Sequence, residues 1–173
     1  MSSQLEIQDL SVTFSRGEER VYAVTDVTMS IGAGEIIGLV GESGCGKSVT
    51  TKAILRLFSN SSVEIGGQVL FDNQNLLDKS EKSMRQIRGK RIALIPQNPL
   101  SSLNPVLTIG EQVAEPLIKH YGVTKREAWK KAREMLTQVG FPQGEAYLKR
   151  YANEFSGGMR QRIAIAMALI SEP

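Results

Sequence analysis

Residues 41–48 read Gly41-Glu42-Ser43-Gly44-Cys45-Gly46-Lys47-Ser48 and fit the pattern G-x-x-x-x-G-K-[ST], in which a glycine-rich turn binds phosphate. The apolar run at 35–40 before this turn has the length of a strand, and the segment from Val49 to Phe58 after it has apolar residues at helical spacing. A strand, a glycine-rich turn and a helix in this order are the context that the pattern requires. Residues 41–48 therefore predict a site for nucleotide phosphates rather than a chance match in an ordinary turn.

Each residue type in this turn has a physical role. Its three glycines permit backbone angles that a side chain would forbid, so main-chain N–H groups can approach phosphate closely. The helix that follows directs the positive end of its dipole at the same anion. Lys47 is expected to reach the β- and γ-phosphates, Ser48 to ligate Mg²⁺, and Cys45 to contribute mainly its backbone. The expected nucleotide-binding residues of this segment are Gly41, Glu42, Ser43, Gly44, Cys45, Gly46, Lys47, Ser48 and Val49.

The whole chain is short and mildly basic. Its 173 residues suit one domain, or a domain with a small insertion, and its hydrophobic content of 41% suits a globular protein. The net charge of +3 is compatible with nucleotide, an anionic membrane surface or nucleic acid, and decides among none of them. The single cysteine excludes an internal disulfide. The longest apolar run, Ile163 to Ile170, is far below the roughly 20 residues that cross a bilayer, so we expect a soluble, cytoplasmic protein that reaches a membrane only through a partner.

Two runs near the start, at 5–14 and 21–31, alternate apolar and polar residues and are joined by a polar turn. Because such alternation is typical of a half-buried strand, they predict an antiparallel pair. A further strand is expected at 66–72 and a helix at about 80–88. The apolar run at 91–96 predicts a buried strand that ends on a proline.

The character of the sequence changes from Gln97 to about Tyr151, a stretch that predicts a mostly helical insertion into an α/β frame. Thr108 and Thr124 each stand three residues before a glutamate, and this capping box is typical of a helix start. The lysines and arginines at 125–133 are compatible with a nucleic-acid patch, but they share their helix with glutamates and lack interleaved aromatics. We interpret them as a solvated helix face.

A second helix start suited to an anion comes after this insertion. Ser156 is a natural N-cap, Gly157 and Gly158 free the backbone beneath it, and the segment at 159–170 is mostly apolar. Alone, a Ser-Gly-Gly turn indicates little more than a helix start.

Taken together, the turn at 41–48, Gln97 at the end of a strand, and Phe155-Ser156-Gly157-Gly158-Met159 at the start of a helix resemble the ATP-binding subunit of ABC transporters. Two longer stretches, 95–105 and 156–162, are similar to the branch that imports peptides or nickel. The resemblance runs from about residue 5 to the last residue. It implies an α/β fold in which a P-loop NTPase core carries an N-terminal antiparallel β subdomain and a helical insertion, with an incomplete central parallel sheet.

The resemblance implies three parts and two partners. The parts are a core with its β subdomain at 1–96, a helical subdomain with a glutamine loop at 97–155, and a signature helix that returns to the core at 156–173. A second ATPase subunit is expected to sandwich ATP and Mg²⁺ head to tail with this one. An integral membrane permease is expected to bind the loop after Gln97, which implies a peripheral position on the inner face of the cell membrane. No nucleic acid is expected.

Single residues also receive roles from the resemblance. Phe14 matches the aromatic that stacks on adenine, with an ordinary strand core residue as the alternative. Gln97 matches the glutamine that senses Mg²⁺ and the attacking water, so it joins Lys47 as a catalytic residue and Ser48 as a metal-site residue. The signature that contacts the γ-phosphate on the opposite subunit matches Ser156, Gly157 and Gly158.

Two positions depart from the usual pattern of the family. Phe155 stands where leucine is usual, and Asn98 where aspartate is frequent. Both leave the anion-binding backbone unaltered.

The resemblance further implies an absence. In the family, a strand with the Mg²⁺-binding aspartate and then the catalytic glutamate follows the position of Pro173, and a switch histidine comes later; His120 does not match it and is interpreted as a surface residue. We therefore expect an N-terminal fragment of a longer ATP hydrolase, inactive by itself. The missing strands would lie between the runs at 36–40 and 92–95. The fragment is thus expected to expose unpaired edges and apolar surface, and to be marginal or aggregating.

Other interpretations have less support. A P-loop kinase or GTPase would need an acceptor site or a base-reading motif, and a DNA-repair ABC ATPase would need a long coiled-coil insertion; the sequence has neither. A non-catalytic nucleotide-binding or interaction fragment remains open for the chain itself. The sequence identifies neither the transported solute nor whether the second ATPase subunit is a copy of this one.

Overall fold

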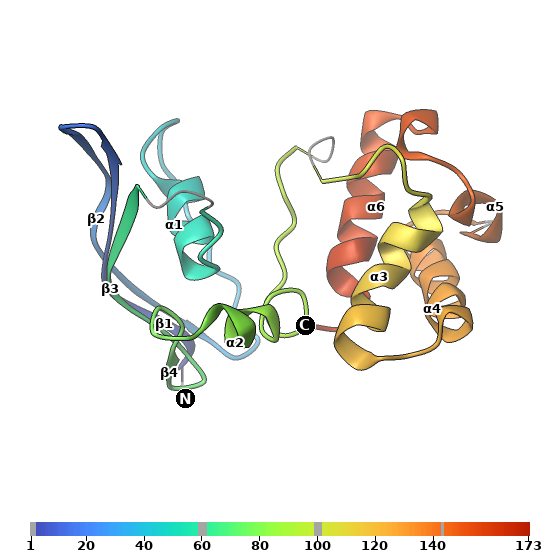
Figure 1. Ribbon diagram of the computed structural model, residues 1–173, viewed down its shortest axis with the longest axis horizontal. Coiled ribbons are helices and arrows are strands. Elements are labelled where there is room, and N and C mark those ends of the chain that lie inside the picture. Colours follow the sequence, from blue (N-terminus) through green and yellow to red (C-terminus); the bar gives the residue numbers. More distant parts are fainter. Residues whose placement is uncertain (1–2, 59–61, 99–101, 143) are drawn as a thin grey trace. The chain divides into compact units, whose positions relative to one another are not determined.

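The computed structural model describes residues 3–58, 62–98, 102–142 and 144–173 (Figure 1). They form two compact units, residues 1–84 and residues 85–173. The first unit contains an antiparallel sheet with two short helices, and the second contains the longer helices.

The sheet of the first unit has four strands in the order β2-β1-β3-β4, and each neighbouring pair is antiparallel. The strands are β1 (Ser3–Arg16), β2 (Glu19–Gly32), β3 (Val63–Phe71) and β4 (Gln74–Asn75). The expected pairing of the first two runs is confirmed, and the strand expected at 66–72 is β3, which lies on the other side of β1. Buried side chains from three strands form the core of this sheet: Ile7, Leu10, Val12, Val24 and Val69.

Two helices accompany the sheet. Helix α1 (Lys47–Ile54) buries Ala53, and helix α2 (Glu81–Arg85) buries Met84. Both are shorter than the sequence predicts. Helix α1 stops before Phe58 because Arg56 has a positive φ of 51°, a conformation that does not continue a right-handed helix.

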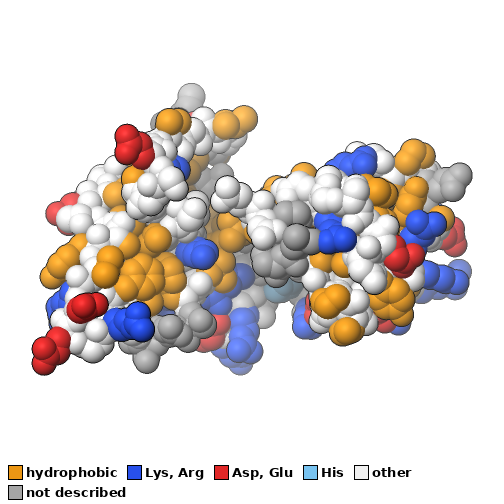
Figure 2. Space-filling view, turned by 90° about the horizontal axis from the view of Figure 1, so that it is seen from above, with side chains coloured by type: hydrophobic (Ala, Val, Ile, Leu, Met, Phe, Trp, Pro, Cys, Tyr) orange, Lys and Arg blue, Asp and Glu red, His pale blue; other side chains and the backbone are white. Residues whose placement is uncertain are grey.

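The apolar run at 35–40 is not a strand, so this expectation is wrong for the chain as it stands. Its side chains are exposed, and Ile36 and Val40 are 96% and 92% accessible to solvent. A strand exists through hydrogen bonds to a neighbour, and none of the described segments pairs with 35–40. Figure 2 shows hydrophobic side chains on the surface of the first unit.

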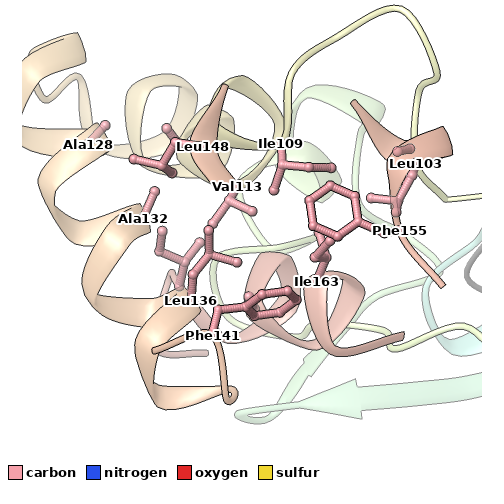
Figure 3. Close-up of a cluster of buried hydrophobic side chains, with 14 of the residues drawn as sticks. Leu103, Ile109, Val113, Ala128, Ala132, Leu136, Phe141, Leu148, Phe155 and Ile163 are labelled. Carbon is pink, nitrogen blue, oxygen red and sulfur yellow. The ribbon is translucent and has the colours of Figure 1, made fainter. Parts of the chain in front are cut away.

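The second unit is built around four helices. They are α3 (Ile109–Tyr121), α4 (Lys125–Gln138), α5 (Gly144–Leu148) and α6 (Gly157–Leu169), with a 3-10 turn at Ala152–Glu154 before α6. Both expected capping boxes are confirmed, because Thr108 and Thr124 each exchange hydrogen bonds with the glutamate three residues on. Side chains from all four helices meet in one core (Figure 3), which includes Val113, Leu136, Phe141, Leu148, Phe155 and Ile163.

The run at 91–96 is also not a strand, and the prediction of a buried strand there is wrong. Ile92 forms only an isolated bridge with Arg88, while Leu94 and Ile95 are 40% and 43% exposed. The reason is the same as for 35–40, because no described segment pairs with this run.

The expected division into 1–96, 97–155 and 156–173 stays a prediction. Residues 85–96 and 156–173 belong to the same compact unit as the helices between them. Within that unit, α6 packs against both α3 and α4.

Candidate functional site

The glycine-rich turn leads from the segment at 35–40 into α1, and its backbone needs glycine at particular points. Gly44 and Gly46 have positive φ values of 87° and 94°, which other residues rarely adopt. Gly46 also lies against β2, since a Cβ atom there would come within 2.6 Å of the carbonyl oxygen of Ala23. The sheet therefore fixes the point at which α1 begins.

The first turn of α1 is open to an anion. Gly46 is the N-cap residue, no side chain caps the helix, and its first turn contains no acidic residue. The amides at the start of a helix point outward without partners inside the helix, and the dipole adds positive potential there. A Cβ atom on Gly41 would lie 2.6 Å from the Sγ of Cys45, so glycine is also what keeps this side of the turn open.

Lys47 reaches back across the turn that it follows. Its Nζ donates hydrogen bonds to the carbonyl oxygens of Gly41, at 2.6 Å, and Glu42, at 2.5 Å, and lies 3.4 Å from the Sγ of Cys45. The ammonium group is thus held against the turn by two of its carbonyl groups. A bound phosphate would exchange these neutral carbonyl contacts for stronger charge-assisted ones.

Two hydroxyl residues follow Lys47. Ser48 is exposed, and its hydroxyl has no hydrogen-bond partner among the described residues. Thr50 is buried, and its hydroxyl donates to the carbonyl oxygen of Gly46 at 3.1 Å. This hydrogen bond stabilises the first turn of α1. Sequence reasoning missed Thr50 because the motif ends two residues earlier. The turn thus combines uncapped amides, one ammonium and one free hydroxyl, which fits a magnesium–nucleotide phosphate tail.

Phe14 lies near the end of β1, opposite Val21 on β2 and Val63 on β3. It is half-buried, and its ring meets the ring of Phe58 edge-on with centroids 5.6 Å apart. The structure therefore brings Phe14 into the same unit as residues 41–49. The stacking role of Phe14 stays a prediction.

The other predicted site residues lie in the second unit. Ser156 is the N-cap of α6, and its Oγ accepts a hydrogen bond from the amide of Met159 at 3.4 Å. Gly157 and Gly158 are exposed, and a Cβ atom built on either would meet nothing within 4 Å. Packing inside the chain does not explain why these two positions are glycine. Gln97 is also exposed, which is ordinary for a polar residue that precedes a loop.

The departure at Phe155 has a structural reason. Its side chain is buried in the core of the second unit, where its ring contacts those of Phe141 and Tyr147. The Nε of Arg160 donates to the carbonyl oxygen of Phe155 at 2.8 Å, which fixes the backbone directly before Ser156. The aromatic residue at this position packs in the core directly before the start of α6.

The loop after Gln97 is held by a side chain that sequence reasoning missed. Gln112 is buried in α3, and its Nε2 donates to the carbonyl oxygens of Asn104 and Leu107, both at 2.9 Å. Its Oε1 accepts from the amide of Asn104 at 2.7 Å. Residues 99–101 of this loop lie outside the described residues. No sequence pattern distinguishes Gln112 from an ordinary polar helix residue.

Neither unit contains a membrane span among its described residues, since every helix there is too short or too polar to cross a bilayer.

Comparison with known proteins places the chain in a family. Residues 24–173 match the family model described as ABC transporter. The chain is 46% identical over 174 residues to the dipeptide transport ATP-binding protein DppD of Bacillus subtilis, covering 100% of this chain and 52% of that protein. It is 43% identical over 169 residues to the oligopeptide transport ATP-binding protein OppD of Salmonella typhimurium, covering 98% of this chain and 50% of that protein. The chain thus spans about half the length of these curated relatives.

A solved structure extends the similarity to three dimensions. It is the dimeric, post-hydrolysis state of an ATP-binding cassette bound to ADP and Pi. The TM-score is 0.85 at 32% sequence identity, over 98% of this chain and 70% of that one. The expected fold class is confirmed by this similarity, because the mixed α/β chain follows the fold of an ATP-binding cassette.

Proposed function

The chain belongs to the ABC transporter family, and we propose that it is the N-terminal part of an ATP-binding subunit that drives the import of peptides. The glycine-rich turn with Lys47 held against it is the observation that carries this proposal, because its uncapped amides and ammonium group suit the phosphates of ATP. Peptides are favoured over nickel as the solute because relatives at 43% to 46% identity are named for dipeptide and oligopeptide transport.

In this proposal the chain binds one ATP molecule, and all the residues assigned to it except Gln97 belong to the first unit. Residues 41–49 surround the phosphates with amide groups, Lys47 contacts the β- and γ-phosphates, and Phe14 stacks on adenine. Ser48 and Gln97 hold Mg²⁺, which would neutralise charge on the phosphates when bound. Lys47 and Gln97 are the catalytic residues that this chain supplies.

The second unit is proposed to act on a nucleotide held by another subunit. Gly157 and Gly158 are exposed with open space around them, and Ser156 leaves the helix start accessible. This supports a head-to-tail pair, in which the α6 start of each subunit contacts the γ-phosphate on its partner. Closure of the pair would be passed to a membrane permease through the loop after Gln97, which places the subunit on the inner face of the cell membrane.

We further propose that the 173-residue chain binds ATP without turning it over. The chain spans about half the length of its curated relatives, and the catalytic carboxylates of the resemblance lie outside the sequence. Hydrolysis needs a carboxylate that activates water, and none of the site residues assigned above has that role. The chain alone would therefore act as a non-catalytic nucleotide-binding fragment.

The test is a titration of the chain with a fluorescent ATP analogue and Mg²⁺. Lys47→Ala should weaken binding at least tenfold, since a hydrogen bond to a charged group contributes about 1.5–3 kcal/mol. Lys52→Ala is the matched control, because Lys52 is an exposed lysine in the last turn of the same helix; it should change the dissociation constant less than twofold. Equal effects of the two substitutions would contradict the phosphate role of Lys47.

ATP turnover should stay at background for the unaltered chain, and Lys47-dependent turnover would disprove the claim that it is inactive.

A further inference from the structure

Helices α4 and α5 enclose a hollow on the surface of the second unit. Its volume is about 640 Å³, and it is lined by Thr124, by residues of α4 as far as Arg133, and by Glu145 and Leu148 of α5. A second hollow of about 590 Å³ shares Arg133 and Glu145 with it, so the depression continues along α4. We call the first hollow the α4–α5 groove. It contains none of the residues assigned to nucleotide binding.

The floor of this groove carries a fixed aromatic ring. Trp129 lines the groove and packs partly against the core of the unit. Its ring also reaches α3, where a Cβ atom on Gly110 would lie only 3.0 Å from it. A rigid aromatic side chain beside an aliphatic one, Leu148, is typical of an anchoring pocket for an apolar side chain.

Trp129 also has an unsatisfied polar group. Its Nε1 is buried and has no hydrogen-bond partner in the described part of the chain. A buried donor without an acceptor is costly, and native structures rarely keep one without a reason. Because this atom is shielded from solvent, a bound acceptor could reach it only if the Trp129 ring moved.

The charges around the groove favour an acidic partner. Arg126, Lys130 and Arg133 line it, and neither Arg126 nor Lys130 has an ion-pair partner among the residues described. The two lining carboxylates already have partners, because Glu127 accepts hydrogen bonds from Thr124 in the capping box and Glu145 lies 3.4 Å from Arg133. Over the whole second unit, residues 85–173 contain 14 lysines and arginines against 7 aspartates and glutamates.

We propose that the α4–α5 groove binds an acidic segment of a partner protein, with one apolar side chain seated on Trp129 and carboxylates facing Arg126 and Lys130. In a peptide, the negative charges can be spaced so that carboxylates face Arg126 and Lys130 and are absent opposite Glu127 and Glu145. A nucleic-acid backbone carries a charge at every phosphate and would also meet Glu127 and Glu145. The basic flank of α4 is then more than the solvated helix face expected from the sequence. This inference does not rest on the proposed function, since the groove lies in the unit without the glycine-rich turn.

The probe is a fluorescein-labelled 12-residue peptide. It contains one leucine between two glutamates, and the two glutamates are four residues apart. It is titrated into the full 173-residue chain, with peptide anisotropy and the emission of Trp129, the only tryptophan of the sequence, as two readouts. We expect saturable binding that shifts the Trp129 emission. Lys130→Glu should weaken this binding at least tenfold. Lys131→Glu is the matched control, because Lys131 is an exposed neighbour on the same helix that does not line the groove; it should change the dissociation constant less than twofold.

Three results would overturn the proposal. The first is no saturable binding of the peptide, or no change in Trp129 emission when it binds. The second is an equal loss for Lys130→Glu and Lys131→Glu, or binding that survives replacement of the glutamates by glutamine, because the groove charges would then not be the cause. The third is tighter, Lys130-dependent binding of an oligothymidylate or of phosphatidylglycerol vesicles, which would assign the groove to nucleic acid or membrane instead.

Discussion

At the scale of single residues, Gly67 is the position in the sheet where a side chain is least tolerable. It lies inside β3 with a φ of 86°, opposite the irregular part of β1 between Gln8 and Ser11. A Cβ atom there would overlap the backbone oxygens of Gln8 and Asp9. Because backbone atoms of a paired strand cannot move aside singly, the strain would spread through the β1–β3 pairing.

Gly67→Ala should therefore lower the free energy of unfolding by at least about 2 kcal/mol, the sum of a left-handed backbone and a contact with a neighbouring strand. Gly66→Ala is the control, because Gly66 has no positive φ and a methyl group on its Cα would meet nothing within 4 Å. Urea unfolding followed by far-ultraviolet circular dichroism measures both. Similar losses for the two variants would show that the strain at residue 67 is unimportant.

Residue identity could be predicted from the sequence wherever a motif specifies it. The positive φ values of Gly44 and Gly46 follow from the motif that contains them. Gly67 and Gln112 matter just as much to their surroundings, but their roles depend on strands and loops that meet them from elsewhere in the chain. No local pattern carries that information.

At the scale of elements, the start of α4 is coupled to pH. The pKa of Glu127 lies below its ordinary value of 4.5, because its carboxylate accepts hydrogen bonds first from the side chain and then from the backbone amide of Thr124. A carboxylate with a lowered pKa in the folded state stabilises that state above pH 4.5, and this stabilisation is lost as the pH falls through the folded pKa. The same holds for Glu111, which caps α3 with Thr108.

Thr124→Ala should accordingly destabilise the chain by about 1 kcal/mol at pH 7, a typical value for the loss of an N-cap. As the pH falls from 7 through the folded pKa of Glu127, the difference from the unaltered chain should shrink, because protonation of this carboxylate weakens the capping box. Urea unfolding followed by Trp129 fluorescence reports on α4 directly. Thr137→Ala in the same helix, where the hydroxyl donates to the carbonyl oxygen of Arg133, should have an effect that does not depend on pH. A pH-independent loss for Thr124→Ala would exclude the coupling.

Element bounds could be predicted where capping chemistry marks them. Helices α3 and α4 begin one residue after their threonines, as the capping boxes predict. The end of α1 carries no such mark, and apolar spacing extends it wrongly to Phe58 although Leu57 is exposed. Helix α5, with five residues, is too short for periodicity to reveal.

At the scale of the whole molecule, the sequence predicts strands that the chain does not form. The antiparallel pair of β1 and β2 was predictable, because these two strands follow one another closely in sequence, whereas β3 joins β1 from beyond α1. The runs at 35–40 and 91–96 have the composition of buried parallel strands, which depend on neighbours distant in sequence. The composition of a segment shows that it favours a buried strand, but the strand forms only if a neighbouring strand is present to pair with it.

The exposed run at 35–40 should make the 173-residue chain associate with itself. Ile36 and Val40 are almost fully exposed, and an unpaired apolar segment offers both hydrophobic surface and free backbone groups to another copy. Val40→Lys should reduce this association at micromolar concentration, as sedimentation velocity would show. Val106→Lys is the control, since Val106 is 75% exposed but follows Pro105 outside the described strands and helices. A cooperative, monomeric melt of the unaltered chain would contradict the expectation.

The same substitution should act in the opposite direction in a protein of the relatives' full length. If further residues pair with the run at 35–40, as the family resemblance implies, Val40 becomes a buried strand residue and Val40→Lys buries a charge. That should lower the stability of the longer protein by about 3 kcal/mol or more and weaken ATP binding at the adjacent turn, while Val106→Lys leaves both unchanged. Thermal denaturation and nucleotide titration of both lengths measure this reversal. A Val40→Lys substitution that improves or spares the longer protein would mean that the run at 35–40 is an exposed segment in both.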